Sequence, residues 1–266
     1  MADVGALLAA YDEQVRPSES RNLPPGVHAE RDGPIVRIVG QYRGFISAPA
    51  DLALGGDRLD ALIARQRDFF AQRGEAVEWK IRSHDRPEDL AVRLRRAGFV
   101  PEPRETVLIG LAAEQAARQA GSVPEVSIRL TDTAEDMRRI AAMESEVWAQ
   151  DWSWLADDLA GRVATGQFAV FVAEVGDQVV SSAWLVFKPG TQFAGLWGGA
   201  TLPGWRGRGI YRALVARRAE TAAGRGVRYL QVDASDDSRP ILERLGFVAV
   251  TTTTPYVWDP AEGKMA

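Results

Sequence analysis

One stretch of the chain decides the fold: Leu202-Pro203-Gly204-Trp205-Arg206-Gly207-Arg208-Gly209-Ile210-Tyr211-Arg212-Ala213-Leu214. It follows an apolar run at 193–202 that predicts a strand, and it leads into a predicted helix over 209–223. The first turn of a helix has unpaired N–H groups and a positive partial charge, which suit a diphosphate. The stretch therefore predicts an anion-binding loop at a strand-to-helix junction.

The residue types within this loop fit phosphate binding. Gly207 and Gly209 have no side chains that would keep phosphate oxygens away from the backbone amides. Positive charge comes from three arginines, Arg206, Arg208 and Arg212. The chain as a whole has a net charge of −4. The arginines therefore make a local anion site on an acidic protein.

Two other phosphate-binding motifs were compared with this loop. A Walker loop needs Gly-Lys followed by Ser or Thr, and the sequence contains none. A dinucleotide fingerprint needs a third glycine where this chain has Arg212, a position at which helix and strand pack closely. Asp233 does end the following strand, as a ribose-binding acid would. The dinucleotide interpretation therefore stays open as the weaker alternative.

The elements predicted around the loop alternate between strands and helices. Thr133 is a predicted helix cap, with Asp136 in the capping-box position three residues later. In order, the sequence predicts strand 127–130, helix 134–148, helix 154–164, strand 168–175, strand 178–187, strand 193–202, helix 209–223, strand 228–232, helix 240–245 and strand 247–256. This order indicates an α/β domain with a mixed sheet.

The first half of the chain repeats part of this pattern. Ala61–Arg65 (Ala-Leu-Ile-Ala-Arg) matches Ala213–Arg217 (Ala-Leu-Val-Ala-Arg) at an offset of 152, and Gly74 matches Gly226 at the same offset. In both halves a strand follows, at 77–81 and 228–232, and then a short helix that ends in Gly-Phe. The pattern predicts a tandem duplication. The alternative is that helix-strand-helix order is simply common in α/β proteins.

The duplication gives the predicted architecture. The segment 112–126 has the composition of a helix tail followed by a linker, and it sets the predicted boundary. We expect one domain over residues 1–120 and a second over 125–266. The predicted class is α/β (α+β), with two domains that each hold a mixed, mostly antiparallel sheet flanked by helices.

The second half resembles the GNAT superfamily of N-acetyltransferases, whose acyl-CoA loop reads Arg/Gln-x-x-Gly-x-Gly/Ala. Arg206–Tyr211 matches this loop except that Tyr211 replaces the last small residue, and Leu245–Phe247 matches a downstream Leu-Gly-Phe. The resemblance covers residues 127–258. It implies that acetyl-CoA binds as a cosubstrate, without a metal. The implied cofactor-binding residues are Ala200, Thr201, Leu202, Arg206, Gly207, Arg208, Gly209, Ile210, Tyr211 and Ser235.

The resemblance also assigns roles within that set. It implies that the loop amides bind the pyrophosphate and that the strand end at 200–202 pairs with the pantetheine arm. One N–H of that strand end would polarise the thioester carbonyl. An acceptor amine would then attack directly, which suits a chain without cysteine.

Two departures from the family concern catalysis. A tyrosine that often protonates the leaving thiolate is replaced by Leu242, and the strand before the loop, 193–200, contains no acid. We expect Tyr256, near the end of the last strand, to serve as the acid, and Glu146 to serve as the base. Three further carboxylates stay open as the base, Glu144, Asp151 and Asp233, because reach cannot be inferred from the sequence. A structural role for each candidate, a neutral amine, and a water chain that removes the proton are the alternatives.

Tryptophans gather in the segment where this family builds its acceptor pocket. Trp148, Trp152 and Trp154 lie there, and Trp184 and Trp197 lie in predicted central strands. Aromatic rings beside a carboxylate suit an amine with an apolar part. Core packing is the alternative for Trp148 and Trp152, which are spaced as neighbours on one helix face.

In the first half, the positions that match the loop have lost its chemistry. At the offset of 152 they are Leu54, Gly55, Gly56 and Asp57. An aspartate at a pyrophosphate site repels the ligand in any medium. We therefore expect a degenerate first domain that does not bind CoA, as in known tandem GNAT proteins with one inactive half.

Composition excludes several other functions. A pI near 5.4 argues against nucleic acid as a partner. The absence of cysteine excludes disulfides and thiolate metal sites, and a histidine-based metal centre or a hydrolase triad would have to be built around His28 or His84. No signal peptide or membrane-spanning run is evident, so a cytoplasmic location and no membrane partner are expected.

Two functions remain. The first is an N-acetyltransferase that acts on a small-molecule amine. The second is a catalytically silent acyl-CoA-binding or regulatory protein, which the missing tyrosine and strand acid favour. The intact loop favours cofactor binding in both cases, and a homodimer is left open.

Overall fold

The computed structural model describes residues 3–21, 23–24, 26–118 and 123–261. Contacts divide the chain into two units. The first consists of Met1–Leu108, Asp233–Glu243 and Val248–Ala266, and the second of Ile109–Val232 and Arg244–Phe247.

The second unit is built on a mixed sheet. Its strands are β7 (Ser127–Thr131), β8 (Phe168–Val175), β9 (Gln178–Phe187), β10 (Phe193–Thr201) and β11 (Tyr229–Ala234, whose last two residues count with the first unit). They lie in the order β11-β10-β9-β8-β7. Only β10 and β11 are parallel, and the other three neighbouring pairs are antiparallel. The predicted mixed, mostly antiparallel sheet is confirmed.

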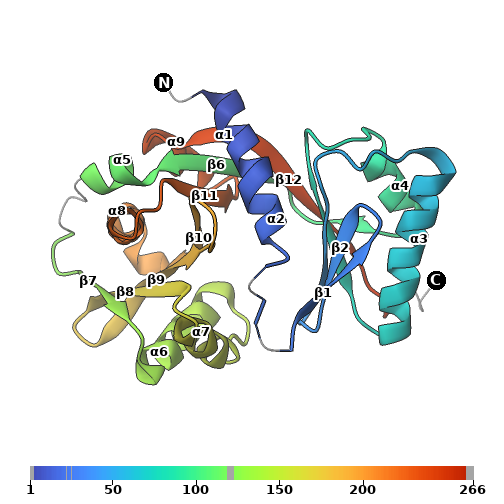
Figure 1. Cartoon of the computed structure of the whole chain (residues 1–266). Helices are drawn as coiled ribbons and strands as arrows, with labels where there is room; N and C mark the ends of the chain where they lie inside the picture. Colours follow the sequence, from blue (N-terminus) through green and yellow to red (C-terminus); the bar gives the residue numbers. More distant parts are fainter. Residues whose placement is uncertain (1–2, 22, 25, 119–122, 262–266) are drawn as a thin grey trace. The chain divides into compact units, whose positions relative to one another are not determined.

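Helices cover this sheet as the sequence predicted. They are α5 (Ala112–Ala117), α6 (Ala134–Trp148), α7 (Leu155–Ala164) and α8 (Ile210–Gly224). Thr133 caps α6, since its Oγ1 accepts the N–H of Asp136 at 3.2 Å. Figure 1 shows α6 and α7 on one side of β8–β10 and α8 on the other.

The first unit contains a shorter version of the same arrangement. Its elements are α1 (Val4–Ala10), the π-helix η1 (Tyr11–Val15), α2 (Arg16–Ser18), β1 (His28–Asp32), β2 (Ile35–Val39), β3 (Gly44–Ser47), α3 (Gly56–Arg73), β4 (Val77–Arg82), α4 (Leu90–Arg96), β5 (Val100–Pro101), α9 (Arg239–Arg244) and β12 (Val248–Trp258). β6 (Glu105–Leu111) begins in the first unit and ends in the second.

Strand pairing supports the duplication. β1–β2 and β2–β3 are antiparallel and β3–β4 is parallel, and β8–β9, β9–β10 and β10–β11 repeat this sequence of directions. A long helix precedes the last strand in each set, and a left-handed glycine lies between helix and strand: Gly74 (φ 66°) caps α3, and Gly226 (φ 75°) follows the cap of α8. The two halves therefore share strand directions as well as element order.

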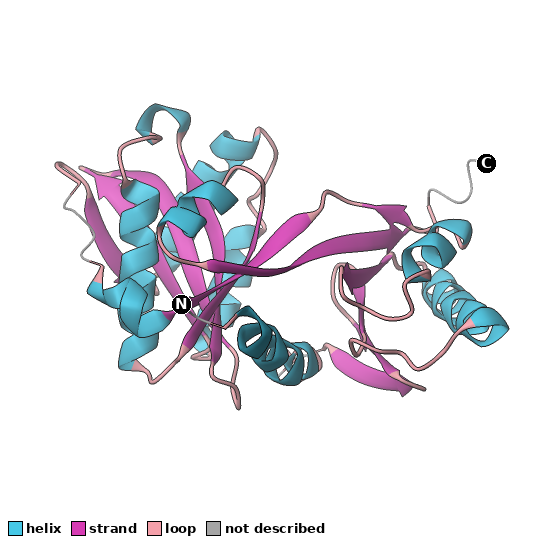
Figure 2. Ribbon diagram, turned by 90° about the horizontal axis from the view of Figure 1, so that it is seen from above, coloured by secondary structure: helices cyan, strands magenta, loops and turns pink. Residues whose placement is uncertain are grey.

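The compact units do not coincide with the segments 1–120 and 125–266. β12 pairs with β4 from Thr253↔Arg82 to Trp258↔Val77, and so the last strand belongs to the first unit. Figure 2 colours the strands magenta and the helices cyan. Pairing between strands distant in sequence leaves no local signal along the chain. The expected boundary near 121–124 lies partly outside the described residues.

Candidate functional site

The glycine–arginine loop has the backbone that its sequence predicts. Gly207 (φ 76°) and Gly209 (φ 89°) both adopt the left-handed conformation that disfavours other residues. Gly209 is the N-cap of α8, and no side chain there accepts a hydrogen bond from the first turn. The amides at this helix start therefore keep their capacity to bind an anion.

The loop arginines lie on the surface around this helix start. Arg206 Nε donates to the carbonyl oxygen of Thr201 at 3.0 Å and ties the loop to the end of β10. The guanidinium of Arg208 stacks on Trp205, 4.5 Å from the ring centroid. Arg212 is exposed, with Nη2 3.5 Å from the position that a Cβ on Gly209 would take. Arg206 thus has a structural contact, whereas Arg208 and Arg212 supply charge beside the amides.

Tyr211 departs from the family motif, and the structure shows how it is accommodated. A Cβ on Gly199 would lie 2.9 Å from Cε2 of Tyr211, so the ring packs directly on this glycine of β10. Burial raises the pKa of the Tyr211 hydroxyl. The large side chain at the loop is thus matched by a glycine opposite it.

β10 is irregular where it approaches the loop. Trp197 pairs with Trp184 and Ala200 with Ser182, so β10 has one residue more than β9 between these pairs. The parallel ladder with β11 runs only from Phe193↔Tyr229 to Gly195↔Gln231, although β10 continues to Thr201. The bulge and the early end of the ladder leave the last part of β10 diverging from β11.

The end of β10 directs one amide away from β9. Leu202 N–H donates to the carbonyl of Val180 at 3.0 Å, so it is engaged within the sheet. In an antiparallel ladder alternate residues face the partner strand, so the backbone of Thr201 faces the opposite side. Arg206 binds the Thr201 carbonyl on that side. Of the expected residues, Thr201 is therefore the one whose N–H points to the diverging side.

A buried carboxylate of α6, Glu144, contacts β9, the strand that pairs with this end of β10. Glu144 of α6 is 2% exposed, and its Oε1 accepts the hydroxyl of Ser182 at 2.8 Å. Its Oε2 accepts the indole N–H of Trp148, also at 2.8 Å. Burial raises the pKa of Glu144, and the bonds from Ser182 and Trp148 oppose that rise.

Two expected catalytic residues lie elsewhere. Glu146 is exposed, because the helix turns Glu144 rather than Glu146 towards the sheet. Tyr256 is 4% exposed and belongs to the hydrophobic core of the first unit, where the guanidinium of Arg95 lies 5.5 Å from its ring. The first side chain therefore faces solvent and the second packs a core, and both catalytic roles stay predictions. Leu242, at the position of the family tyrosine, is fully buried.

The remaining polar candidates have structural partners. Asp151 is exposed and accepts the N–H of Ser153, which lowers the pKa of its carboxyl. Asp233 pairs with Lys80 at 2.8 Å within the first unit. Ser235 lies in the turn before α9, where its Oγ accepts the N–H of Ser238 at 3.4 Å. None of these contacts involves the loop.

The tryptophans of the second unit are not core residues. Trp148, Trp154 and Trp197 are 55%, 57% and 44% exposed. Trp152 is half-buried and stacks on Trp154, with ring centroids 5.3 Å apart. The core-packing alternative for Trp148 is therefore wrong, and aromatic surface is available beside Glu144.

Sequence reasoning missed two residues of this region, Ser182 and Arg218. Arg218 of α8 is 1% exposed and donates to the carbonyls of Trp184 and Trp197, at 3.4 and 3.2 Å. Both residues are polar within an apolar pattern. Ser182 lies in the strand sequence Val-Val-Ser-Ser-Ala-Trp-Leu-Val, and Arg218 lies four residues from Leu214 and from Ala222 on one face of a helix. That mismatch is a signal that could have found them.

The matching loop of the first unit has a different backbone. Gly55, the N-cap of α3, is extended at φ −155°, and Asp57 lies exposed in the first helical turn. The carboxylate of Asp57 itself occupies the positive, N-terminal end of the helix dipole, where an anionic ligand would otherwise bind. The position that could hold an anion thus carries a fixed negative charge.

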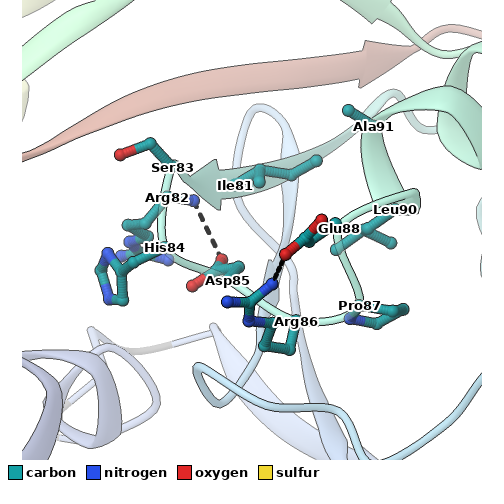
Figure 3. Close-up of a pocket in the computed structure, with 10 residues that line it drawn as sticks. All are labelled: Ile81, Arg82, Ser83, His84, Asp85, Arg86, Pro87, Glu88, Leu90 and Ala91. Atoms are coloured by element: carbon teal, nitrogen blue, oxygen red, sulfur yellow. Dashed lines mark hydrogen bonds and ion pairs between the residues drawn. The ribbon is translucent and has the colours of Figure 1, made fainter.

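A shallow cavity of about 310 Å³ also lies in the first unit, between β4 and α4 (Figure 3). The charges along its wall are paired: Asp85 accepts the N–H of Arg82 and binds Arg16, and Arg86 pairs with Glu88. Such a lining leaves no charge to recognise a phosphate. This cavity is therefore not the candidate site.

His84, on the same wall, joins a hydroxyl and a carboxylate. Its Nδ1 lies 2.8 Å from Thr251 Oγ1 and its Nε2 3.0 Å from Asp12 Oδ2. The order resembles a nucleophilic triad, but Thr251 is 9% exposed and shares its hydroxyl with Ser83. We interpret the group as a structural network.

Within the described ranges, no group of three or more His, Cys, Asp or Glu side chains is arranged to hold a metal ion. Among the helices that the structure describes, none is long and apolar enough to cross a membrane.

Comparison with known proteins adds a family and a fold. Residues 130–247 match the model of the acetyltransferase (GNAT) family. A GCN5-related N-acetyltransferase from Kribbella flavida is similar in structure, with a TM-score of 0.70 and 16% identity over 98% of this chain and 96% of that chain.

Two further structures align over nearly the whole chain. A tandem GNAT protein from the clavulanic acid biosynthesis pathway has a TM-score of 0.66 and 15% identity, covering 97% of this chain and 94% of that chain. A GCN5-related N-acetyltransferase from Sphaerobacter thermophilus has a TM-score of 0.61 and 14% identity, covering 97% of this chain and 92% of that chain. At these identities the likeness shows the fold. No curated protein sequence matches the chain.

Proposed function

We propose that this protein transfers an acetyl group from acetyl-CoA to the amine of a small molecule, in its second unit, because residues 130–247 match the model of the acetyltransferase (GNAT) family. The observation that carries the proposal is the uncapped start of α8, which follows two left-handed glycines and has Arg208 beside it. That start is an anion site in a domain whose family transfers acyl groups.

The loop and the end of β10 divide the binding of the cosubstrate. The amides of Gly207–Tyr211 hold the pyrophosphate, with charge from Arg208 and Arg212. Ala200, Thr201 and Leu202 form the strand end along which the pantetheine arm lies. The contact between Arg206 and Thr201 keeps these two parts in a fixed relation, which supports their joint use.

The chemistry follows from the same strand end. The acceptor nitrogen attacks the thioester carbon, and the Thr201 N–H stabilises the oxyanion that forms. The C–S bond then breaks and CoA leaves with the electron pair. A chain without cysteine suits this direct transfer, because it needs no covalent enzyme species.

The first unit has a supporting role in this proposal. Asp57 and the extended Gly55 remove the anion site from its loop, so CoA binds in the second unit only. We retain from the sequence a cytoplasmic location and an acceptor that is neither nucleic acid nor membrane. A silent acyl-CoA-binding protein remains the second candidate, favoured by Leu242 in the position of the family acid.

The two candidates are distinguished by turnover. The protein is incubated with acetyl-CoA and a panel of primary amines, and free CoA is measured with a thiol reagent. Amine-dependent release of CoA, above release without protein and without amine, is expected. Acetyl-CoA that binds but gives no amine-dependent release across the panel would favour the silent protein.

A further inference from the structure

Glu144 is a buried carboxylate that has no cation beside it. Its two oxygens accept hydrogen bonds from neutral groups, the Ser182 hydroxyl and the Trp148 indole, each at 2.8 Å. Among the described residues, no arginine or lysine forms an ion pair with it. By contrast Asp136, the other buried acid of α6, binds both Arg129 and Arg139. Glu144 is therefore not part of a structural ion pair within the described part of the chain, and its negative charge is available to a cationic ligand.

Burial gives this carboxyl the acid-base behaviour of a proton acceptor. Loss of solvent raises the pKa of Glu144 above that of an ordinary glutamate, and the two neutral donors compensate only in part. A base works best when its pKa approaches the working pH. The same burial makes a positively charged partner favourable, because an unpaired buried carboxylate is costly.

The position of Glu144 relates it to the proposed reaction. Ser182, which binds Oε1, is the strand partner of Ala200, immediately before Thr201. The carboxylate thus lies against β9 opposite the strand end that the proposed function assigns to the thioester. β10 itself contains no acid, since its sequence is Phe-Ala-Gly-Leu-Trp-Gly-Gly-Ala-Thr.

The outer side of Glu144 is aromatic. Trp148 is 55% exposed, yet its indole N–H is directed at Oε2. This N–H occupies the donor position that an ammonium group would take. Trp154, 57% exposed and stacked on Trp152, lies in the segment that connects α6 to α7, a few residues after Trp148. Such surfaces bind cations and flat apolar groups.

We propose that Glu144 binds the acceptor as an ammonium ion and takes its proton, and that the acceptor is a primary amine carrying an aromatic group. The inference rests on the proposed function. Glu144 removes one proton from the ammonium, and the neutral nitrogen then forms the N–C bond. As the C–S bond breaks, the thiolate leaves, and the second nitrogen proton neutralises it through water. Glu144 finally returns its proton to solvent, so that the reaction releases one proton.

The first test measures activity against pH. The probes are acetyl-CoA with tryptamine, phenethylamine and butylamine, and the variants are Glu144→Gln and, on an exposed position of the same helix, Glu135→Gln. We expect Glu144→Gln to lower kcat/KM for the amines by about 10²-fold and to remove the fall in rate at low pH. Glu135→Gln keeps the wild-type profile. Glu144→Asp, which keeps the carboxylate, retains the acidic limb at reduced rate.

Several outcomes would overturn the assignment. Wild-type rate and pH profile in Glu144→Gln would remove Glu144 from the reaction. Butylamine accepted as well as the aromatic amines would overturn the acceptor class. Failure of the proposed function is recognised separately, because then the wild-type protein gives no amine-dependent release of CoA, or acetyl-CoA fails to raise its melting temperature.

A second measurement needs no acceptor. The ¹⁵N-labelled indole signal of Trp148, assigned with Trp148→Phe, reports the ionisation of the carboxylate that it binds. It is expected to titrate with a pKa above that of a free glutamate, and Glu144→Gln is expected to abolish this titration while leaving the thermal shift by acetyl-CoA unchanged. A titration at the ordinary glutamate value would contradict the role as a base.

Discussion

Nη1 of Arg218 donates hydrogen bonds to the carbonyl oxygens of Trp197 and Trp184, which face each other across β10 and β9. Its Nε donates to Leu214 in the preceding turn of α8. The guanidinium is fully buried, and burial lowers its pKa to about 10, so it stays charged at neutral pH. A buried cation therefore holds both strands at the point where the bulge of β10 begins.

Replacing Arg218 with methionine tests this anchor. The variant keeps a long apolar side chain but leaves buried carbonyls without a donor. We expect the free energy of unfolding to fall by about 2 kcal/mol, with a smaller thermal shift by acetyl-CoA. Urea unfolding measures the first effect, and Arg217→Met, at the exposed neighbouring position, is the control. Wild-type stability and a full thermal shift in Arg218→Met would show that the bulge does not depend on this contact.

Arg208 is expected to contribute charge to acetyl-CoA binding. Arg208→Gln removes the charge beside the amides, so Kd for acetyl-CoA should rise about tenfold, or ~1.4 kcal/mol, and its salt dependence should weaken. Calorimetry at two salt concentrations measures both changes. Arg217→Gln, at an exposed position on α8 that pairs with Glu220, should bind as the wild type does. Equal affinities for the two variants would place the phosphates elsewhere.

Glu105 makes stability depend on pH in the first unit. Burial raises its pKa to about 7, which Lys80 opposes and Asp233 reinforces. Between the ordinary glutamate pKa and about 7, the folded state therefore binds more protons than the unfolded state, and this group costs stability as pH rises through that window.

Replacement of Glu105 with glutamine is expected to remove this cost. The variant should gain stability relative to the wild type between pH 5 and pH 8, on the order of 1 kcal/mol after allowance for solvent screening. Urea midpoints at the two pH values give the difference. A constant difference between the two proteins across this range would contradict the raised pKa.

Tyr256 is expected to matter for packing and not for catalysis. Its ring belongs to the core of the first unit, together with residues such as Trp79 and Leu94. Tyr256→Phe keeps that ring, so turnover with any accepted amine should equal the wild-type value. The free energy of unfolding should change by less than about 1 kcal/mol. A loss of turnover near 10²-fold, at unchanged stability, would restore the role of thiolate acid that the sequence suggested.

The sequence predicted local elements well because their signals are local. Helix 134–148, strand 168–175 and strand 178–187 were predicted with the bounds that the structure has. The left-handed glycines of the loop followed from the residue type. Period, caps and turn residues act over a few positions, and one sequence contains them all.

The parts that sequence missed depend on distant partners. Placing β12 beside β4 and turning Glu144 towards Ser182 require the three-dimensional arrangement. The sequence could not show which of Glu144 and Glu146 faces the sheet, because helical facing had to be known to within two residues. The sequence also could not place Tyr256 in a core, because its strand joins the core of the first unit.

The central claim, one acetyl-CoA site per chain at the start of α8, is tested most directly by calorimetry on matched loop variants. Gly209→Asn and Gly209→Asp bear the same backbone strain at φ 89°, but only aspartate adds a negative charge where the phosphates bind. Asp57→Asn makes the opposite change in the first unit. We predict one site in the wild type, binding kept in Gly209→Asn and lost in Gly209→Asp, and no second site in Asp57→Asn. Two equivalent sites in the wild type, or equal binding by the two Gly209 variants, would contradict the claim.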